Sequence, residues 1–356
     1  MKVIHIITAL ESGGAEKVLY QILAGLKDEF YHEVWPLSKR GMYTAMISNL
    51  GIAVNRPSPM RILKLIFCHW RHKMKKKKGE RESIIVHSHL YHSHLLSLLF
   101  WIVGIPVLWS IHSSVPISGQ ILVSRIASAI SYFVPKKIIF VSDSSRKEHE
   151  TLGMDVKRSV VIYNGVDLVS CKKNKKLSKN KKTLANIAMI SRYHPDKNYP
   201  LFCEIASRVK KKTPSKFTLL GLGNTRDNTE LISLLDQYNL KDNVSLLGQK
   251  ESTVDLLTDF NLVVSTSKNE SFGLSIIEAI FAGVNVSTID LKVMDELLGE
   301  YSPNVGNICL DEIAEIWVRK AMTKPDSALL SLVSNHFSLK RMIDSTRELY
   351  LGIESV

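Results

Sequence analysis

Residues 260–288 read FNLVVSTSKNESFGLSIIEAIFAGVNVST, which contains a strand, a helix and a second strand in succession. The β-branched run at 262–266 predicts a buried strand, and the apolar residues of 274–281 follow helical spacing. A second short apolar strand is expected at 284–288. A helix between two buried strands is typical of a parallel sheet that is covered by helices.

The same alternation extends through both halves of the chain. In the first half, strands are expected at 3–7, 84–86, 107–111, 138–141 and 160–163, and helices at 15–26, 92–103, 120–133 and 143–151. In the second half, strands are expected at 184–190, 217–220 and 244–247, and helices at 201–211, 229–238 and 253–258. We therefore predict the α/β class, with two doubly wound Rossmann-like domains that face each other across a ligand-binding cleft.

The expected domain boundaries follow from the points where this pattern stops. A first Rossmann-like domain spans residues 1–168, and a lysine-rich linker occupies 169–182. A second Rossmann-like domain spans 183–335, and a last helix is expected within 336–356. The linker is assigned because 172–182 holds seven lysines and no acidic residue, which is typical of a solvated segment.

Composition excludes several classes of protein. A hydrophobic content of 45% with 23% charged residues is globular, and it argues against disorder and against a small disulfide scaffold. Forty-seven Lys and Arg against 34 Asp and Glu give a net charge of +13, which favours phosphate-rich ligands, nucleic acid or an anionic membrane. Four widely spaced cysteines without a C-x-x-C pair, and no signal-peptide pattern at the start, predict a cytoplasmic protein.

Two carboxylates follow the strand at 262–266. Glu270 is expected in the loop and Glu278 within the helix, with the turn opened by Gly273. The backbone amides of Phe272, Gly273 and Leu274 would then form a helix N-terminus suited to phosphate. Glu278 could accept hydrogen bonds from two vicinal hydroxyls such as those of ribose. The alternative is that both glutamates are ordinary loop and surface residues.

Other candidate residues also follow predicted strands. Arg192 and Lys197 lie in the loop after the strand at 184–190, where their long side chains could reach the cleft, although such side chains are often simply solvated. Gly13 and Gly14 could let the first loop approach a ligand closely or could form a plain turn. His112 could contact a ligand at the mouth of the cleft or could be structural.

No metal site is expected. His87, His89, His92 and His94 are close in the sequence, but the first two belong to a strand end and the others to a helix start, so they would not converge on one ion. The sequence also has no D-x-D motif that could hold a divalent cation. We therefore predict no metal and no cofactor.

Several motifs together resemble the family-four retaining glycosyltransferases of GT-B fold. The segment NESFGLSIIEAIFAG at 269–283 resembles the E-x7-E signature of that family. In the same order as in the family, the sequence has a Gly-Gly loop (12–16), a histidine after a strand (111–112), Asn-Gly-Val-Asp (164–167) and ISRYHPDKN (190–198). The last helix resembles one that in the family crosses back to the first domain.

This resemblance implies a role for each matching residue. The first domain would take the acceptor and the second the nucleotide sugar, with His112 and Glu270 at the transferred sugar. Arg192 and Lys197 would stabilise the leaving diphosphate in place of a metal, and Glu278 would bind ribose. The donor-binding set implied by the resemblance is Gly13, Gly14, Arg192, Lys197, Glu270, Ser271, Phe272, Gly273, Leu274 and Glu278.

The implied activity is retaining, metal-independent transfer of a hexose or N-acetylhexosamine from a nucleotide-diphosphate sugar, expected to be a UDP-sugar. The expected acceptor is a glycan or a polyprenyl-linked glycan in bacterial surface-polysaccharide synthesis. The alternatives are a sugar-nucleotide epimerase or phosphorylase of the same architecture and an inactive transferase-like binding protein. A nucleic-acid partner is not expected, because no aromatic residues are interleaved with the basic runs.

The helix expected around residues 61–74 has an interfacial pattern. Leu63, Ile66, Phe67, Trp70 and Met74 recur at helical spacing, with cations around them. We expect peripheral binding to an anionic surface on the inner face of the cytoplasmic membrane, and the alternative is a solvated helix end. The residues expected to face the membrane are Arg61, Lys64, Trp70, Arg71, Lys73, Lys75, Lys76, Lys77 and Lys78.

Overall fold

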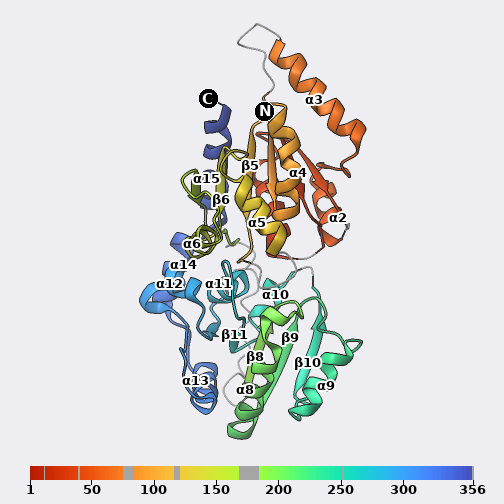
Figure 1. The fold of residues 1–356 in the computed structure, drawn as a ribbon. Helices are drawn as coiled ribbons and strands as arrows, with labels where there is room; N and C mark the ends of the chain where they lie inside the picture. Colours follow the sequence, from red (N-terminus) through yellow and green to blue (C-terminus); the bar gives the residue numbers. More distant parts are fainter. Residues whose placement is uncertain are drawn as a thin grey trace. The chain divides into compact units, whose positions relative to one another are not determined.

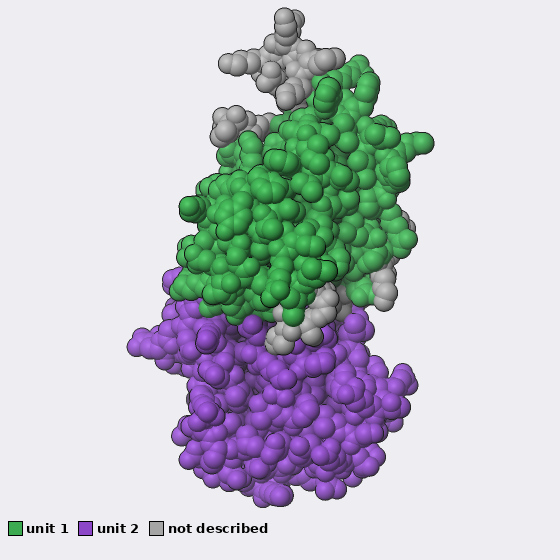
Figure 2. All heavy atoms as spheres, viewed as in Figure 1, with its two compact units in different colours: residues 1–165, 339–356 green, residues 166–338 purple. Residues whose placement is uncertain are grey.

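The computed structural model describes residues 1–11, 13–38, 41–74, 83–115, 121–167, 184–250 and 252–354, drawn as a ribbon in Figure 1. By their contacts these residues form two compact units. Unit 1 holds Met1–Gly165 with Leu339–Val356, and unit 2 holds Val166–Ser338 (Figure 2). The linker expected at 169–182 lies outside the described residues.

Unit 1 is built on a parallel sheet with the strand order β3-β2-β1-β4-β5-β6-β7. Its strands are β1 Lys2–Ile7, β2 Tyr31–Pro36, β3 Ala53–Val54, β4 Ile84–His89, β5 Val107–Ile111, β6 Lys137–Phe140 and β7 Ser159–Val161. Its helices are α1 Gly14–Leu26, α2 Met42–Asn49, α3 Pro59–Met74, α4 Tyr91–Ile102, α5 Ile121–Ile130, α6 Asp143–Thr151 and α15 Leu339–Glu354. The strand order runs outward in both directions from β1 and β4, which is the doubly wound arrangement.

The first strand and helix of unit 1 show why the sequence folds in this way. β1 is buried on both faces, as is usual for a strand inside a parallel sheet. The apolar stripe of α1, expected from its 3.6-residue spacing, is buried against the sheet. Residues 95–111 are a long, mostly apolar stretch that comprises most of α4, a turn with Gly104 at φ 82° and the strand β5. Among the described residues no helix combines the length and apolarity needed to cross a bilayer.

The last helix of the chain, α15, is an integral part of unit 1. A Cβ atom on Gly25 would lie 2.3 Å from Cδ1 of Ile343, so the Ile343 side chain of α15 packs directly over this glycine of α1. The hydroxyl of Tyr350 lies 2.7 Å from Nδ1 of His87 in the buried centre of the sheet. Arg347 pairs with Glu29 at the surface. The core of unit 1 is therefore completed by the final residues of the sequence.

Unit 2 is built on a second parallel sheet, with the order β10-β9-β8-β11-β12. Its strands are β8 Ala185–Ile190, β9 Ser215–Leu220, β10 Val244–Gly248, β11 Leu262–Ser265 and β12 Asn285–Thr288. Its helices are η1 Pro195–Lys197, α8 Tyr199–Lys212, α9 Thr229–Gln237, α10 Val254–Leu257, α11 Leu274–Phe281, α12 Lys292–Leu298, η2 Gly299–Tyr301, α13 Leu310–Met322 and α14 Ser327–His336.

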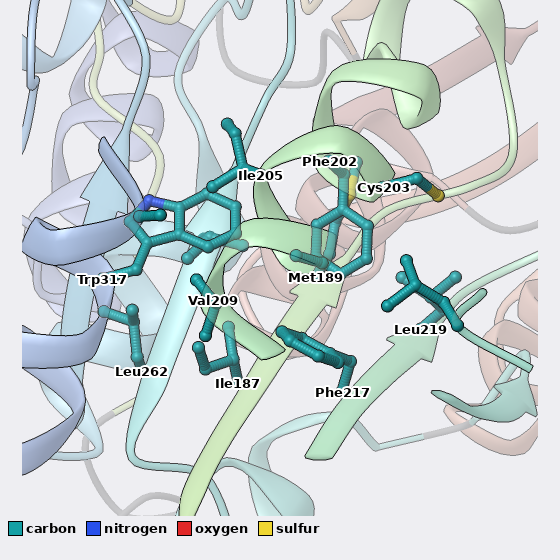
Figure 3. Packing of buried hydrophobic residues seen from close by; sticks show 14 of the residues in the cluster. Ile187, Met189, Phe202, Cys203, Ile205, Val209, Phe217, Leu219, Leu262 and Trp317 are labelled. Carbon is teal, nitrogen blue, oxygen red and sulfur yellow. The ribbon is translucent and has the colours of Figure 1, made fainter. Parts of the chain in front are cut away.

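The core of unit 2 lies between its sheet and the helices α8 and α13 (Figure 3). Trp317 of α13 packs on Phe202 of α8 with ring centroids 6.0 Å apart, and Phe202 meets Phe217 of β9 edge to face. These three side chains are fully buried. The patterns considered above do not predict α13, although its residues Ile313, Ala314, Trp317 and Ala321 form a buried helical stripe. They also miss β2, α2 and β3 in unit 1.

The boundaries of the predicted elements agree with the structure to within a few residues. The α11 and α6 ranges are confirmed as predicted, at 274–281 and 143–151. The helix predicted at 120–133 is shorter, because α5 ends at Ile130 and a turn follows. Residue 120 lies outside the described ranges.

Replacing Tyr350 by phenylalanine should destabilise the protein by about 1–3 kcal/mol, because a buried polar atom of His87 loses its partner while the packed ring remains. Urea unfolding of the full-length protein measures this loss. Tyr132→Phe is the matched control, since the side chain of Tyr132 is 60% exposed. Equal stability of the two variants would contradict a structural role for the Tyr350 hydroxyl.

Candidate functional site

The candidate site begins where the strand order of unit 2 changes direction. β8 pairs with β9 on one side and with β11 on the other, all in parallel, so the three strands end at the same edge of the sheet. In open parallel sheets, ligands bind at the carboxyl ends of the strands where neighbouring connections diverge. The loops at 191–198 and 266–273 leave the sheet at this point.

Hydrogen bonds join these two loops. The hydroxyl of Thr266 donates to the carbonyl of Lys197 at 2.9 Å, and the backbone N–H of Lys268 donates to the carbonyl of Asp196 at 2.8 Å. Asn198 follows with φ 53°, in the left-handed region where asparagine is tolerated. The backbone of the first loop is therefore held by the second.

The same contacts bring together two residues that are 73 positions apart in the sequence. Nζ of Lys197 lies 2.5 Å from Oε1 of Glu270, and Ser267 donates its hydroxyl to the same oxygen at 2.8 Å. Both partners of the ion pair are mostly screened from solvent, with side-chain exposures of 17% and 21%. The ammonium group of Lys197 is thus held in one position. A cation held in this way can stabilise negative charge on a ligand at this edge of the sheet.

Helix α11 begins at Leu274, four residues after Glu270 of this pair. Gly273 is the N-cap residue with φ 76°, a conformation that favours glycine. The side chain of Phe272 is buried and packs edge to face on Phe337, so it belongs to the core while its backbone leads into the helix. Leu274 is the first helical residue. The helix N-terminus predicted at 272–274 is therefore present.

Glu278 lies on the second turn of α11 and is buried, with 4% exposure. The hydroxyl of Thr253 lies 3.4 Å from its Oε2 atom, next to α10. Because its side chain is buried, Glu278 is not the ordinary surface glutamate of the alternative interpretation. A buried carboxylate needs hydrogen-bond donors.

The backbone around Arg192 is held by the glycine-containing loop at 221–224, which follows β9. Gly221 has φ 136°, and a Cβ atom there would lie 2.2 Å from the carbonyl oxygen of Ser191. Asn224 donates its side-chain amide to that same carbonyl at 2.8 Å, and the N–H of Tyr193 donates to the carbonyl of Leu222 at 2.7 Å. The backbone on both sides of Arg192 is therefore fixed, while its side chain is exposed.

Ser271 directly precedes Phe272 in unit 2 and is partly buried. The other predicted donor-site residues belong to unit 1. Gly13 is the N-cap of α1 in an extended conformation with φ −171°, and Gly14 is the first helical residue. A Cβ atom on Gly13 would meet only the movable carboxylate of Glu16, so the backbone fold does not itself require this glycine. His112 directly follows β5, and its Nε2 atom lies 3.0 Å from Nδ1 of His89.

Sequence reasoning missed the buried histidines that continue from His112. His5 on β1 is hydrogen-bonded to His89, and His32 on β2 is hydrogen-bonded to His5. His92, by contrast, is exposed, and His94 stacks on Trp109 and contacts Ser88. The available signal was the alternate spacing of His87 and His89, which places both on one face of a strand.

Helix α3 has an exposed apolar stripe on its outer face. Met60, Leu63, Phe67 and Trp70 are 81%, 65%, 66% and 57% exposed. Leu65 is buried, and Ile66, expected in the outer stripe, is partly buried. Arg61, Lys64 and Arg71 are exposed around the stripe. The side chain of Lys73 and the residues Lys75, Lys76, Lys77 and Lys78 lie outside the described part of the chain.

Two protein families match this sequence one after the other. Residues 12–170 match Glycosyltransferase Family 4, and residues 171–320 match Glycosyl transferases group 1. The chain belongs to the GT-B glycosyltransferases. Both halves of the glycosyltransferase are thus matched by families of the same activity, and the predicted fold class is confirmed.

Named proteins are similar to this chain in sequence or in structure. The glycosyltransferase is 22% identical to the capsular polysaccharide biosynthesis glycosyltransferase CapH of Staphylococcus aureus, over 99% of both chains. A poly(ribitol-phosphate) alpha-N-acetylglucosaminyltransferase of the same species is 38% identical over 30% of this chain and 21% of its own length. The crystal structure of Anabaena HepE with UDP-glucose has a TM-score of 0.79 at 18% identity, covering 99% of this chain and 100% of HepE.

Replacing Gly221 by alanine should destabilise unit 2 by several kcal/mol, because the new Cβ atom would overlap a backbone carbonyl that cannot move independently. Gly283→Ala is the matched control. Gly283 also has a positive φ, of 70°, but has no atom within 4 Å of the added Cβ, so only about 1 kcal/mol should be lost. Urea unfolding compares the two variants, and equal losses would contradict the close approach to Ser191.

Proposed function

We propose that this glycosyltransferase is a retaining, metal-independent enzyme that transfers a hexose or N-acetylhexosamine from a UDP-sugar to a glycan or lipid-linked glycan acceptor. Its products would belong to bacterial surface polysaccharides. The observation that carries the proposal is the Lys197–Glu270 pair at the edge where β8 and β11 diverge.

The chemistry requires positive charge at the leaving group. Transfer breaks the bond between the anomeric carbon of the sugar and an oxygen of the diphosphate, and negative charge grows on that oxygen. A fixed ammonium group and a helix N-terminus both stabilise such charge. Lys197 supplies the first, Gly273 and Leu274 the second, and Arg192 adds a more mobile cation. These groups could replace the divalent metal that would otherwise neutralise the diphosphate.

The carboxylates have different proposed partners. Glu270 accepts hydrogen bonds through Oε1 from Lys197 and Ser267, and its other oxygen could accept one from a hydroxyl of the transferred sugar. Glu278 is proposed to accept from the ribose hydroxyls. The E-x7-E resemblance supports this division and the retaining outcome. Ser271 and Phe272 would line the phosphate through their backbone. The resemblance assigns Gly13 and Gly14 of unit 1 to donor binding and His112 to the transferred sugar.

The proposed donor and acceptor are supported by the relatives. HepE was crystallised with UDP-glucose, and the poly(ribitol-phosphate) relative carries N-acetylglucosaminyltransferase in its name. A Campylobacter jejuni relative, 25% identical over 46% of this chain and 44% of its own length, is named for an acceptor linked to diphospho-undecaprenol. CapH is named for capsular polysaccharide synthesis. A UDP-sugar and a lipid-linked glycan are therefore the first substrates to test.

A lipid-linked acceptor would also give α3 a role. We propose that its exposed stripe inserts into the inner face of the cytoplasmic membrane, with Arg61, Lys64 and Arg71 near anionic head groups. Each cation near such a surface contributes about 1 kcal/mol of binding free energy. Apolar insertion adds a contribution that salt does not screen.

The full-length protein should transfer sugar from a UDP-sugar to a lipid-linked glycan, and the product should keep the anomeric configuration of the donor. Radiolabelled UDP-glucose and UDP-N-acetylglucosamine detect transfer, and NMR of the product gives its configuration. Lys197→Ala should lower kcat/KM by about 10²–10³-fold, because a fixed charge at the leaving group is lost. Its folding stability should fall by only about 1–2 kcal/mol, because Ser267 still donates a hydrogen bond to the Glu270 carboxylate when the lysine is gone.

Lys216→Ala is the control for this substitution, since Lys216 is exposed at the amino end of β9. It should leave kcat/KM unchanged. Activity should also persist in EDTA. An epimerised UDP-sugar without transfer, an inverted product, or loss of activity in EDTA that added Mg²⁺ restores would each reject the corresponding part of the proposal.

At low salt the protein should sediment with phosphatidylglycerol vesicles and not with phosphatidylcholine vesicles, because anionic head groups attract the cations around α3. The double variant Phe67→Ser and Trp70→Ser should bind more weakly, since both side chains are exposed and apolar. Met322→Ser, an exposed position on α13, serves as the control. Equal binding of the wild type to both vesicles, or to neither, would exclude the proposed membrane contact.

A further inference from the structure

Four histidines step diagonally across the sheet of unit 1. In the strand register, His32 on β2 pairs with Val3, and His5 lies two residues further along β1. His89 lies opposite Ile7 and is therefore two residues further again, on β4. Ser110 on β5 is opposite His89, and His112 lies two residues after Ser110. Steps of two keep all four side chains on one face of the sheet.

The rings are joined by consecutive hydrogen bonds. Nε2 of His32 lies 3.3 Å from the carbonyl of Leu26, and its Nδ1 lies 3.0 Å from Nε2 of His5. Nδ1 of His5 lies 3.2 Å from Nε2 of His89, and Nδ1 of His89 lies 3.0 Å from Nε2 of His112. Within this histidine chain (His32, His5, His89 and His112), each contact joins Nδ1 of one ring to Nε2 of the next.

Burial keeps these rings neutral near pH 7. It lowers the pKa of His32 and of His112 to about 4, and it lowers the pKa values of His5 and His89 well below 6.5, helped by the neighbouring rings. A neutral imidazole has one N–H donor and one acceptor nitrogen. Once it is known which nitrogen carries the proton in one ring, the protonated nitrogen of every other ring in the chain follows.

The carbonyl of Leu26 sets the direction of the chain. A carbonyl can only accept, so Nε2 of His32 carries the proton and its Nδ1 accepts. His5 must then donate through Nε2, and the same argument applies to His89 and finally to His112. At the end of the chain, His112 carries its proton on Nε2 and its lone pair on Nδ1.

We propose that His32, His5 and His89 are positioning residues that hold His112 in the Nε2–H form, so that its Nδ1 accepts a hydrogen bond from a sugar hydroxyl at the carboxyl edge of the unit 1 sheet. This role for Nδ1 rests on the proposed glycosyl transfer. The hydrogen-bonded chain itself does not. It follows that the group that His112 recognises must be a hydrogen-bond donor.

A metal ion is the competing explanation for the cluster, since ligand atoms of His5, His87 and His89 lie within 4.8 Å of one another. Both nitrogens of His5 are already used in the chain. Those of His87 lie 2.7 Å from the hydroxyls of Tyr350 and Ser110. A metal would have to break these contacts, and no carboxylate belongs to this group among the described residues to offset its charge.

Nuclear magnetic resonance of the full-length protein with ¹⁵N-labelled histidine tests the chain directly. Coupling between two nitrogens across an N–H···N hydrogen bond identifies both partners and the one that carries the proton. We expect three couplings, from Nε2–H of His5 to Nδ1 of His32, from Nε2–H of His89 to Nδ1 of His5, and from Nε2–H of His112 to Nδ1 of His89. A proton on Nδ1 of His112, the absence of its coupling to His89, or one equivalent of bound zinc in the purified protein would overturn the proposal.

His32→Leu tests whether the far end of the chain controls His112. With the link to Leu26 removed, the chain can reverse, and a second signal from Nδ1–H of His112 should appear. His94→Phe is the matched control, because His94 is equally buried in unit 1 and lies outside the chain. It should leave the His112 signal unchanged. His32→Gln keeps a donor and an acceptor and should restore the single form, and no change in any variant would overturn the proposal.

Activity provides a separate readout of the functional part. His32→Leu should lower kcat/KM for transfer by about tenfold, a size typical of losing a group that orients a site residue, and His32→Gln should recover part of it. Unchanged kcat/KM in a variant whose His112 signal has changed would reject the role of Nδ1. If the wild type transfers no sugar at all, the proposed function fails, whereas the couplings still decide whether the histidine chain exists.

Discussion

Parallel pairing of β8 with both β9 and β11 is the constraint on which the candidate site depends. It places three loops at one edge of the unit 2 sheet, and hydrogen bonds from the loop at 266–268 then fix the backbone around Lys197. A register shift of one residue would turn every side chain of a strand to the other face. The ion pair between Lys197 and Glu270 therefore depends on the register of the sheet as well as on the two residues that form it.

Much of this arrangement could be predicted from sequence because it depends on short-range patterns. The alternation of β-branched runs and 3.6-residue stripes predicts the sheets, and α11 begins and ends where its pattern does. Contacts between distant loops could not be predicted in this way. The pairing of Lys197 with Glu270 depends on backbone turns at Asn198 and Gly273, and the need for glycine at position 221 depends on where the Ser191 carbonyl lies.

The buried histidines show a second reason why sequence was insufficient. Polar residues in a predicted strand do not reveal which strand lies beside them, and β2, which carries His32, was not predicted at all. The order β2-β1-β4-β5 brings together side chains from residues 32, 5, 89 and 112, a sequence order that no local pattern contains. A polar group inside a sheet is tolerated only when its partners arrive from such neighbours, so topology is what makes these histidines compatible with burial.

The packing of α15 on unit 1 has a consequence for how the protein is made. Ribosomes release the chain from its first residue onward, so residues 1–165 emerge long before residues 339–356, with all of unit 2 between them. Until then, the surface around Gly25 and His87 lacks the helix that covers it. Domains generally fold as units during synthesis, but unit 1 must wait until residues 339–354 have been made, and its incomplete form would expose apolar surface to chaperones or to aggregation.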